Sequence, residues 1–254
     1  MADAADSTES IYDSASPQWA RSEKLLLSDF TARPFVLQKL EPLAGLRVLD
    51  LGCGEGFVAR QIKTAGAATV LAIDLSAGMI EQARAEEERT PLGIEYRQAN
   101  AAELNDLPAA SFDRVAAVFL FNYVDSTIMT EVMRRVRRWL APGGRFVFTV
   151  PHPSLPFIRE EAPPFFFKAG DLGYFSGTDQ TLEGLIWRRD GVSVPVRCVH
   201  KPFEVYFQAL RAAGWQNMPD LMELAVRPEH IELDPDFFGP LRDQPLHLLF
   251  SVDG

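Results

Sequence analysis

The chain has 254 residues, of which 47% are hydrophobic and 24% charged, and its formal net charge is −10. This length and composition predict one α/β domain with an elaboration, built around a hydrophobic core. The negative charge disfavours DNA or RNA as a partner, because phosphate binding depends on clustered Lys and Arg, and the longest strongly apolar run, residues 115–121, is too short to span a membrane.

The N-terminal residues 1–44 predict helices and no secretory signal. The first residues are acidic and lack an apolar stretch, and the two cysteines, Cys53 and Cys198, cannot form a disulfide framework, so we expect a cytoplasmic protein. Between residues 11 and 40 apolar side chains recur at helical intervals, with breaks at Pro17 and Pro34. Two or three short helices are therefore expected ahead of the core.

From residue 45 onward, short apolar segments alternate with helical segments. The expected strands are residues 47–51, 69–74, 93–98, 112–120 and 145–150. The expected helices are residues 57–65, 77–88 and 128–140. Strands that alternate with helices of this length predict an α/β fold with a doubly wound, mostly parallel sheet.

This alternation stops between His152 and His200, where proline, glycine and aromatic residues are crowded together. Asp190-Gly191 lies between two extended runs and predicts a hairpin turn. A helix at 203–213 and a strand at 246–252 then resume the pattern. We therefore predict an N-terminal helical segment (1–44), a core (45–151), a cap or lid inserted after the fifth strand (152–200) and the rest of the core sheet (201–254).

A glycine-rich turn follows the first expected strand, in the sequence Val48-Leu-Asp-Leu-Gly-Cys-Gly-Glu-Gly56. Such a turn lets a ligand approach the backbone, with free helix N–H groups facing it. The spacing Gly-x-Gly-x-Gly differs from the dinucleotide fingerprint, and the sequence has no Tyr-x-x-x-Lys pair. Both observations argue against the alternative of a nicotinamide-dependent oxidoreductase.

Further motifs follow the later strands in a fixed order. Asp74 ends the second strand, where an acidic side chain can bind ribose hydroxyls, and Asn100-Ala101 follows the third. Phe112-Asp113 opens the fourth strand, and Pro142-Gly143-Gly144 leads into the fifth. Together, over residues 45–152, these motifs resemble those of the class I S-adenosylmethionine-dependent methyltransferase superfamily. The resemblance implies a Rossmann-like sheet of seven strands that binds S-adenosylmethionine.

The resemblance also implies a row of cofactor contacts in the core. Residues expected along the amino-acid part of the cofactor are Asp50, which would order the loop from behind, and the backbone of Gly52, Cys53 and Gly54. Residues expected at the ribose, the adenine and the sulfonium are Asp74, then Leu75, Met79, Asn100 and Ala101, then Val118 and Phe119.

Some of these assignments have rival interpretations. The family usually has Asp where Asn100 stands, although an amide oxygen still accepts a hydrogen bond from the adenine amine. Asp50 could instead cap a turn, and Met79 could belong to the helix core. Tyr12 precedes a helix that could fold over the cofactor, or it could lie in the core or at the surface. Cys53 is expected to act only through its backbone and small size.

The acceptor side has fewer signals. His152 lies in Pro151-His-Pro153 after the fifth strand, where it could act as a general base or could hold the turn through a backbone hydrogen bond. Tyr174, Trp187 and His200, with the aromatic run at 165–167, could wall an acceptor pocket or form the core of the cap. His230 and His247 are expected to be structural, and no residues have metal-ligand spacing.

The resemblance, together with the aromatic residues of the cap, implies methyl transfer to an oxygen or nitrogen of a small molecule, aromatic or heterocyclic in kind. Alternatives are C-methylation and a scaffold that binds the cofactor without catalysis. Nucleic-acid methylation is disfavoured because Phe121-Asn122-Tyr123-Val124 stands where an Asn/Asp-Pro-Pro-Tyr/Phe motif would be expected.

Overall fold

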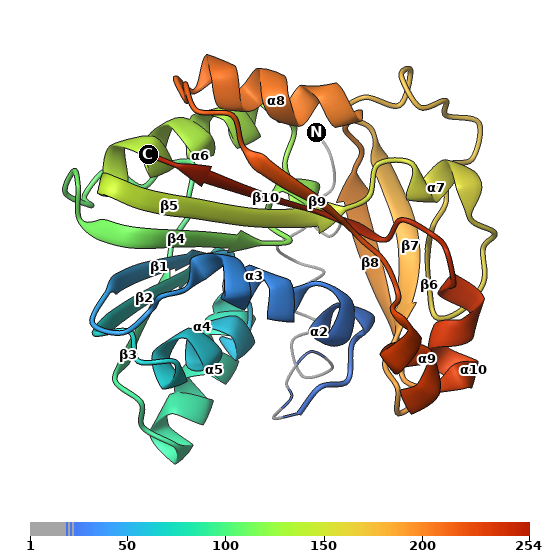
Figure 1. Cartoon of the computed structure of the whole chain (residues 1–254), viewed down its shortest axis with the longest axis horizontal. Helices are drawn as coiled ribbons and strands as arrows, with labels where there is room; N and C mark the ends of the chain where they lie inside the picture. Colours follow the sequence, from blue (N-terminus) through green and yellow to red (C-terminus); the bar gives the residue numbers. More distant parts are fainter. Residues whose placement is uncertain (1–18, 20, 22) are drawn as a thin grey trace.

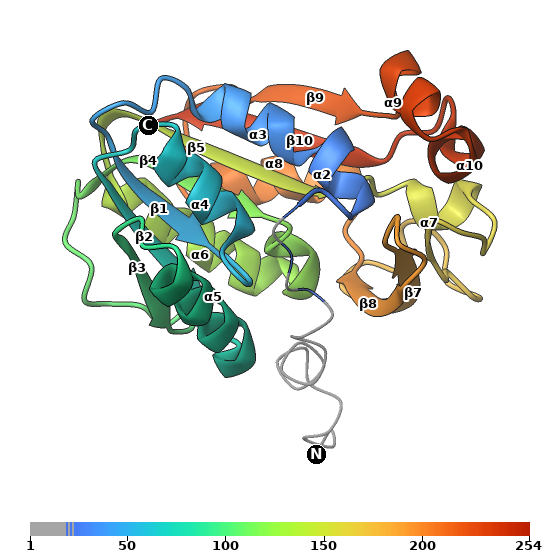
Figure 2. The same ribbon diagram turned by 90° about the horizontal axis from the view of Figure 1, so that it is seen from below.

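A computed structural model describes residues 19, 21 and 23–254. Its centre is a seven-stranded sheet with the order β3-β2-β1-β4-β5-β10-β9 (Figures 1 and 2). The strands are β1 (Arg47–Leu51), β2 (Thr69–Asp74), β3 (Ile94–Gln98), β4 (Phe112–Val118), β5 (Leu140–Pro151), β9 (Asp220–Leu224) and β10 (His247–Asp253). β10 runs antiparallel to both β5 and β9, and the pairs among β1 to β5 are parallel. The predicted doubly wound, mostly parallel sheet is confirmed.

Helices cover both faces of this sheet. The helices are α2 (Leu27–Thr31), α3 (Arg33–Leu40), α4 (Phe57–Thr64), α5 (Ala77–Arg89), α6 (Ser126–Trp139) and α8 (Phe203–Ala212). Buried side chains of α6 and α8 share one core cluster, whereas those of α3, α4 and α5 share a second. The sheet is therefore enclosed on two sides, which leaves the ends of its strands for a ligand site.

The core of the chain follows the predicted periods closely, and the differences lie at element ends and in one strand, β9, that was not predicted. β5 begins at Leu140 rather than at residue 145. Phe112 of β4 already pairs with Leu140, and the register shift before the next pair, Arg114 with Arg145, leaves the Pro-Gly-Gly segment as a bulge within β5. β9 is a short edge strand without a period that would have marked it. None of the helices in the described residues is long and apolar enough to cross a membrane.

A smaller antiparallel sheet lies beyond the end of β5, grouped in Figure 1 with α7 (Leu155–Ile158), α9 (Pro228–Leu233) and α10 (Pro235–Phe238). Its strands are β6 (Phe165–Phe167), β7 (Thr181–Trp187) and β8 (Ser193–Val199), in that order. The predicted hairpin joins β7 to β8, with Gly191 at φ +86°.

This smaller sheet shares a buried cluster with other parts of the chain. Phe165, Phe167 and Val196 pack there with Leu27 from α2 and with Phe238 and Leu241 from the C-terminal segment. The core of the predicted cap (152–200) is thus completed by side chains from outside that range, and its boundaries stay a prediction.

Candidate active site

A cavity of about 210 Å³ lies at the carboxyl ends of β1, β2 and β4. Every predicted cofactor residue in the described part of the chain lines it: Asp50, Gly52, Cys53, Gly54, Asp74, Leu75, Met79, Asn100, Ala101, Val118 and Phe119. Tyr12 lies outside the described residues. Met79 is buried on the packing face of α5, so it lines the cavity and belongs to the helix core at once.

The glycine turn between β1 and α4 forms one wall of this cavity. Gly54 has φ +56°, and a Cβ atom placed on it would meet nothing within 4 Å, so its open side faces the cavity. At Gly56 a Cβ would come within 2.5 Å of the Tyr96 hydroxyl oxygen. Gly56 is therefore required for packing, whereas Gly54 leaves room for a ligand to approach the backbone.

Asp74 is fixed at the end of β2 by backbone groups. Its Oδ2 accepts a hydrogen bond from the N–H of Gly54 at 2.8 Å, and its Oδ1 accepts one from the N–H of Ser76 at 3.0 Å. An ionised carboxylate has about four acceptor sites, so each oxygen can still accept a hydroxyl proton. Asp74 thus holds the loop in place and presents acceptors to a diol.

Asp50 lines the same cavity and is fully buried. Within the described part of the chain, neither of its carboxylate oxygens has a hydrogen-bond partner, so no bond supports the expectation that it orders the loop. Burial raises the pKa of Asp50 to about 7, with Asp74 acting in the same direction and Arg33 opposing the change. A buried carboxylate of this kind is suited to a cationic ligand group, because an ammonium would restore its ionised form.

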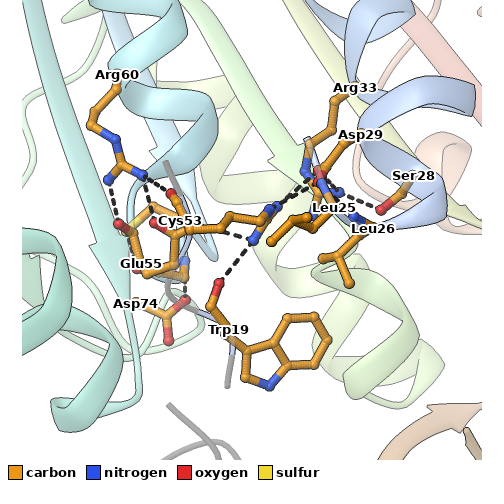
Figure 3. A network of polar contacts seen from close by, with 12 residues as sticks. Trp19, Leu25, Leu26, Ser28, Asp29, Arg33, Cys53, Glu55, Arg60 and Asp74 are labelled. Atoms are coloured by element: carbon orange, nitrogen blue, oxygen red, sulfur yellow. Dashed lines mark hydrogen bonds and ion pairs between the residues drawn. The ribbon is translucent and has the colours of Figure 1, made fainter. Parts of the chain in front are cut away.

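A network of charged side chains lines the side of the cavity next to the segment that precedes α2 (Figure 3). Arg21 donates to Asp29 at 2.9 Å and to Glu55 at 3.0 Å, and Arg60 also pairs with Glu55, at 2.6 Å. Arg33 pairs with Asp29 at 2.9 Å. The network ties the segment before α2 to the glycine turn, and it places Arg21, Arg33 and Glu55 in the cavity wall.

Arg33 is the member of this network best placed to meet a ligand. Its guanidinium carbon lies 5.5 Å from the centre of the Phe119 ring, and its buried Nε has no hydrogen-bond partner among residues that the structure describes. Burial lowers the pKa of Arg33 to about 10 against the opposing effect of Asp29, so the side chain stays charged at neutral pH. The cavity therefore holds a buried carboxyl group, that of Asp50, and a buried cation, Arg33.

At the other end of the cavity, Asn100 forms a local turn. Its Oδ1 accepts from the N–H of Ala102 at 3.0 Å, and its Nδ2 donates to Glu103 at 3.0 Å. These bonds hold the amide in one orientation, with an acceptor lone pair left on the oxygen.

A second cavity, of about 80 Å³, adjoins the first. Both cavities are lined by Trp19, Arg33, Phe119 and Tyr123. Phe119 has φ +59°, which a bulky side chain rarely adopts and which is typical of strained functional positions. The remaining wall is largely apolar. The smaller sheet contributes Phe165, Phe167, Ile186 and Val196, other elements contribute Leu26, Leu27, Ser28 and Pro151, and Asn122 and His247 are buried polar members.

Of the residues that could wall an acceptor pocket, Phe165 and Phe167 line the second cavity, whereas Tyr174, Trp187 and His200 do not. The Tyr174 hydroxyl accepts from the N–H of Phe203 at 2.9 Å, and its carbonyl oxygen accepts from Nε2 of His200 at 2.8 Å. Trp187 packs on Phe166, with ring centres 5.9 Å apart. None of Tyr174, Trp187 and His200 lines either cavity, so their contacts favour the alternative that they form the packing of the cap, and substrate binding by them stays a prediction.

His152 also lines neither cavity. Its Nδ1 accepts from the N–H of Ser154 at 3.2 Å, which leaves Nε2 to donate to Glu223 at 2.9 Å. These bonds match the interpretation in which His152 holds the turn after β5. Its role as a general base stays a prediction without support from these contacts.

Comparison with known proteins identifies the family. Residues 48–144 match the methyltransferase domain model. Over 181 residues the chain is 32% identical to N-demethylindolmycin N-methyltransferase from Streptomyces griseus, an alignment that covers 67% of this chain and 70% of that protein. The chain belongs to the class I S-adenosylmethionine-dependent methyltransferases.

Other relatives of this methyltransferase agree. The crystal structure of an S-adenosylmethionine-dependent methyltransferase from Mesorhizobium loti superposes with a TM-score of 0.63 at 26% identity, over 87% of this chain and 96% of that one. The ubiquinone biosynthesis O-methyltransferase of Xanthomonas axonopodis is 34% identical over 111 residues, which are 44% of this chain and 45% of that relative. The methyltransferase thus spans about half the length of that second relative.

The residues of the first cavity fit S-adenosylmethionine. The carboxylate of Asp50 and the Nε of Arg33, neither of which has a hydrogen-bond partner among the described residues, would hold the ammonium and the carboxylate of its amino-acid end. The open side of Gly54 would leave room for that end, and Asp74 would accept from the ribose hydroxyls. Sequence reasoning missed Arg33, because an arginine in a short helix looks like an ordinary exposed residue.

Among the described residues, no group of three or more His, Cys, Asp and Glu side chains could hold a metal ion. Both cysteines are buried and unbridged, and burial raises the pKa of the Cys53 thiol. The expectation that Cys53 acts only through its backbone and small size stays a prediction.

Proposed function

We propose that this methyltransferase transfers a methyl group to an oxygen or nitrogen atom of a small aromatic or heterocyclic molecule bound in the second cavity. The observation that carries the proposal is the shared wall: Phe119 and Tyr123 border the cofactor cavity on one side and the aromatic-lined cavity on the other. The related enzymes named above act on nitrogen or on oxygen, which supports these two acceptor atoms.

S-adenosylmethionine supplies an electrophilic methyl group on a positively charged sulfur. The contribution of the chain is alignment: Asp50, Arg33 and Asp74 would fix the amino-acid end and the ribose of the cofactor, while the apolar second cavity holds the acceptor in line. Alignment of this kind can supply on the order of 7–11 kcal/mol of barrier reduction. During the transfer the positive charge leaves the sulfur, and the O–H or N–H acceptor releases one proton to water, so that the methylated product is neutral; an apolar cavity favours a step that disperses charge in this way.

The size of the site and the net charge of the whole chain support a small molecule over a nucleic acid. The second cavity measures about 80 Å³ and is bounded by Leu26, Phe165 and Ile186. The net charge of the whole chain is −10, so a phosphate backbone would be repelled over most of the surface.

A mass-spectrometric screen tests the proposal. The purified protein is incubated with S-adenosylmethionine and a panel of phenols, anilines and N–H heterocycles. We expect at least one panel member to gain the mass of one CH₂ group, and to carry three deuterons when the donor has a trideuterated methyl group. Omission of the donor is the control. If calorimetry shows that the cofactor binds but no panel member is methylated, the proposed acceptor class is wrong and a scaffold role gains support.

A further inference from the structure

His247 is a buried polar group in the wall of the second cavity. It lies at the start of β10, is 3% exposed, and its ring meets the Phe119 ring edge to face at a centroid distance of 5.1 Å. The wall also includes Leu27 and Ser28 of α2, the helix that ends at Thr31. His247 is therefore next to Phe119, one of the residues that border both cavities.

The hydrogen bonds of Thr31 determine the tautomer of His247. The Thr31 hydroxyl donates its one hydrogen to the carbonyl oxygen of Leu27 at 3.0 Å. Toward Nε2 of His247, 3.2 Å away, the same oxygen can then only accept. Nε2 must carry the imidazole hydrogen, so Nδ1 is the unprotonated nitrogen and a hydrogen-bond acceptor.

Nδ1 of His247 is buried and, among residues with described positions, has no hydrogen-bond partner. Burial lowers the pKa of His247 to about 3, with Arg33 and His152 acting in the same direction, so the ring is neutral at physiological pH. A buried acceptor that is left unpaired is costly, and a ligand that donates to it removes this cost.

A second acceptor lines the same cavity. Asn122, in the turn after β4, is 2% exposed, and its Oδ1 likewise has no partner in the described part of the chain. Of the described residues in this wall, Arg33 alone carries a charge at neutral pH, and it is a cation. Two acceptors and a cation favour a ligand that brings hydrogen-bond donors and carries no positive charge of its own.

From this geometry, and resting on the proposed function, we propose that the methyl acceptor is an aromatic molecule without a positive charge, whose N–H or O–H group donates to Nδ1 of His247. His247 is then a residue that binds the acceptor and selects for a donor group. Asn122 offers a second acceptor beside it, and the aromatic side chains of the smaller sheet pack on the ring of the ligand. The expectation that His247 is purely structural is revised by this proposal.

Three molecules of nearly equal shape test the inference: phenol, aniline and toluene. Each is titrated into the full-length protein in the presence of S-adenosylhomocysteine, with calorimetry and with ¹⁵N NMR of the histidine rings. Toluene is the most hydrophobic, so an apolar cavity without a specific acceptor would bind it best. We expect phenol and aniline to bind roughly tenfold tighter than toluene or better. We also expect them, unlike toluene, to shift the Nδ1 resonance of His247 toward that of a hydrogen-bonded nitrogen.

Two variants of His247 provide a matched control. A glutamine amide reaches the position of Nε2 and keeps the contact with Thr31, but it leaves no acceptor at the position of Nδ1. An asparagine amide places an oxygen near the position of Nδ1. In His247→Gln the preference should reverse in favour of toluene, whereas in His247→Asn it should persist. Melting temperatures identify any variant that fails to fold, and the wild-type ¹⁵N shift then decides by itself.

The result that overturns the inference is wild-type protein that binds toluene as well as phenol, binds none of the three, or shows an unchanged Nδ1 resonance. Failure of the proposed function looks different. If phenol binds through His247 but the screen finds no methylated product, the cavity is a ligand site outside methyl transfer, and the statement about the acceptor falls with the proposed function. If methylated products appear but phenol and aniline leave the Nδ1 resonance of His247 unchanged, only the inference about His247 is wrong.

Discussion

Asp50→Asn is expected to weaken S-adenosylmethionine binding while it makes the protein without cofactor more stable at pH 8. Asp50 is fully buried, its oxygens have no hydrogen-bond partner among the described residues, and burial raises its pKa to about 7. Removing its charge deletes the expected partner of the cofactor ammonium, which costs about 2–5 kcal/mol of binding free energy. The same change removes an uncompensated buried charge, which should stabilise the apoprotein by on the order of 2–4 kcal/mol.

The pH dependence of both quantities follows from the raised pKa. The folded protein holds a proton on Asp50 up to about pH 7, whereas the unfolded chain loses it near the ordinary value of 3.8. Asp50 therefore does not lower the free energy of unfolding below the ordinary pKa of 3.8, but lowers it progressively as the pH rises from there toward 7. Cofactor binding needs the carboxylate, so the affinity of the wild type should fall as the pH drops below 7, by up to about tenfold per unit.

Thermal melts and calorimetry at about pH 5.5 and about pH 8, on either side of the raised pKa, check these expectations. In Asp50→Asn the stability of the apoprotein and the affinity for the cofactor should both become less dependent on pH. Asp74→Asn is the matched control: both of its carboxylate oxygens already accept backbone N–H bonds, so its removal should not stabilise the apoprotein. Unaltered cofactor affinity in Asp50→Asn, or a loss of stability at pH 8, would contradict the role given to Asp50.

Gly54→Val is expected to abolish cofactor binding and leave the fold intact. Gly54 has φ +56° and lines the cavity with its open side. A valine side chain would enter the space assigned to the amino-acid end of the cofactor, so we expect a loss of at least roughly a hundredfold in affinity. The left-handed backbone also strains any non-glycine residue, which costs about 1–2 kcal/mol of stability.

Gly45→Val separates the two effects. Gly45 has φ +78°, a Cβ there meets nothing within 4 Å, and the residue does not line the cavity. Both variants should melt earlier by a similar amount, with native-like circular dichroism, and only Gly54→Val should fail to bind S-adenosylhomocysteine in calorimetry. Equal binding by the two variants would remove the glycine turn from the cofactor site.

Much of the fold and the cofactor side of the site could be predicted from the sequence, because local patterns carry them. The strand before Gly52 and the position of Asp74 at the end of the next strand can be predicted from residues that lie close together in the sequence. Parallel pairing of these two strands then brings Asp50 and Asp74 to one edge of the sheet. The strand β9 was harder, since an edge strand of mixed residues lacks a clear period.

The acceptor side depends on contacts between residues far apart in the chain. His247 reaches Thr31 across 216 positions, and Arg21 reaches Glu55 across 34, so no local period marks either pair. Aromatic residues such as Tyr174 and Trp187 stood out in the sequence, but composition cannot tell a cavity wall from internal packing. Of the aromatic residues that stood out, the structure places Phe165 and Phe167 in the cavity wall and Tyr174 and Trp187 outside it.

The central claim is that the methyl group of bound S-adenosylmethionine faces the second cavity past Phe119 and Tyr123. The most direct measurement is isotope-filtered NMR of the protein with S-adenosylmethionine carrying a ¹³C-labelled methyl group. We predict nuclear Overhauser effects from that methyl group to the ring protons of Phe119 and Tyr123, which border both cavities. Effects to Leu75 or Ala101, at the end assigned to adenine, without any to Phe119 or Tyr123, would contradict the account.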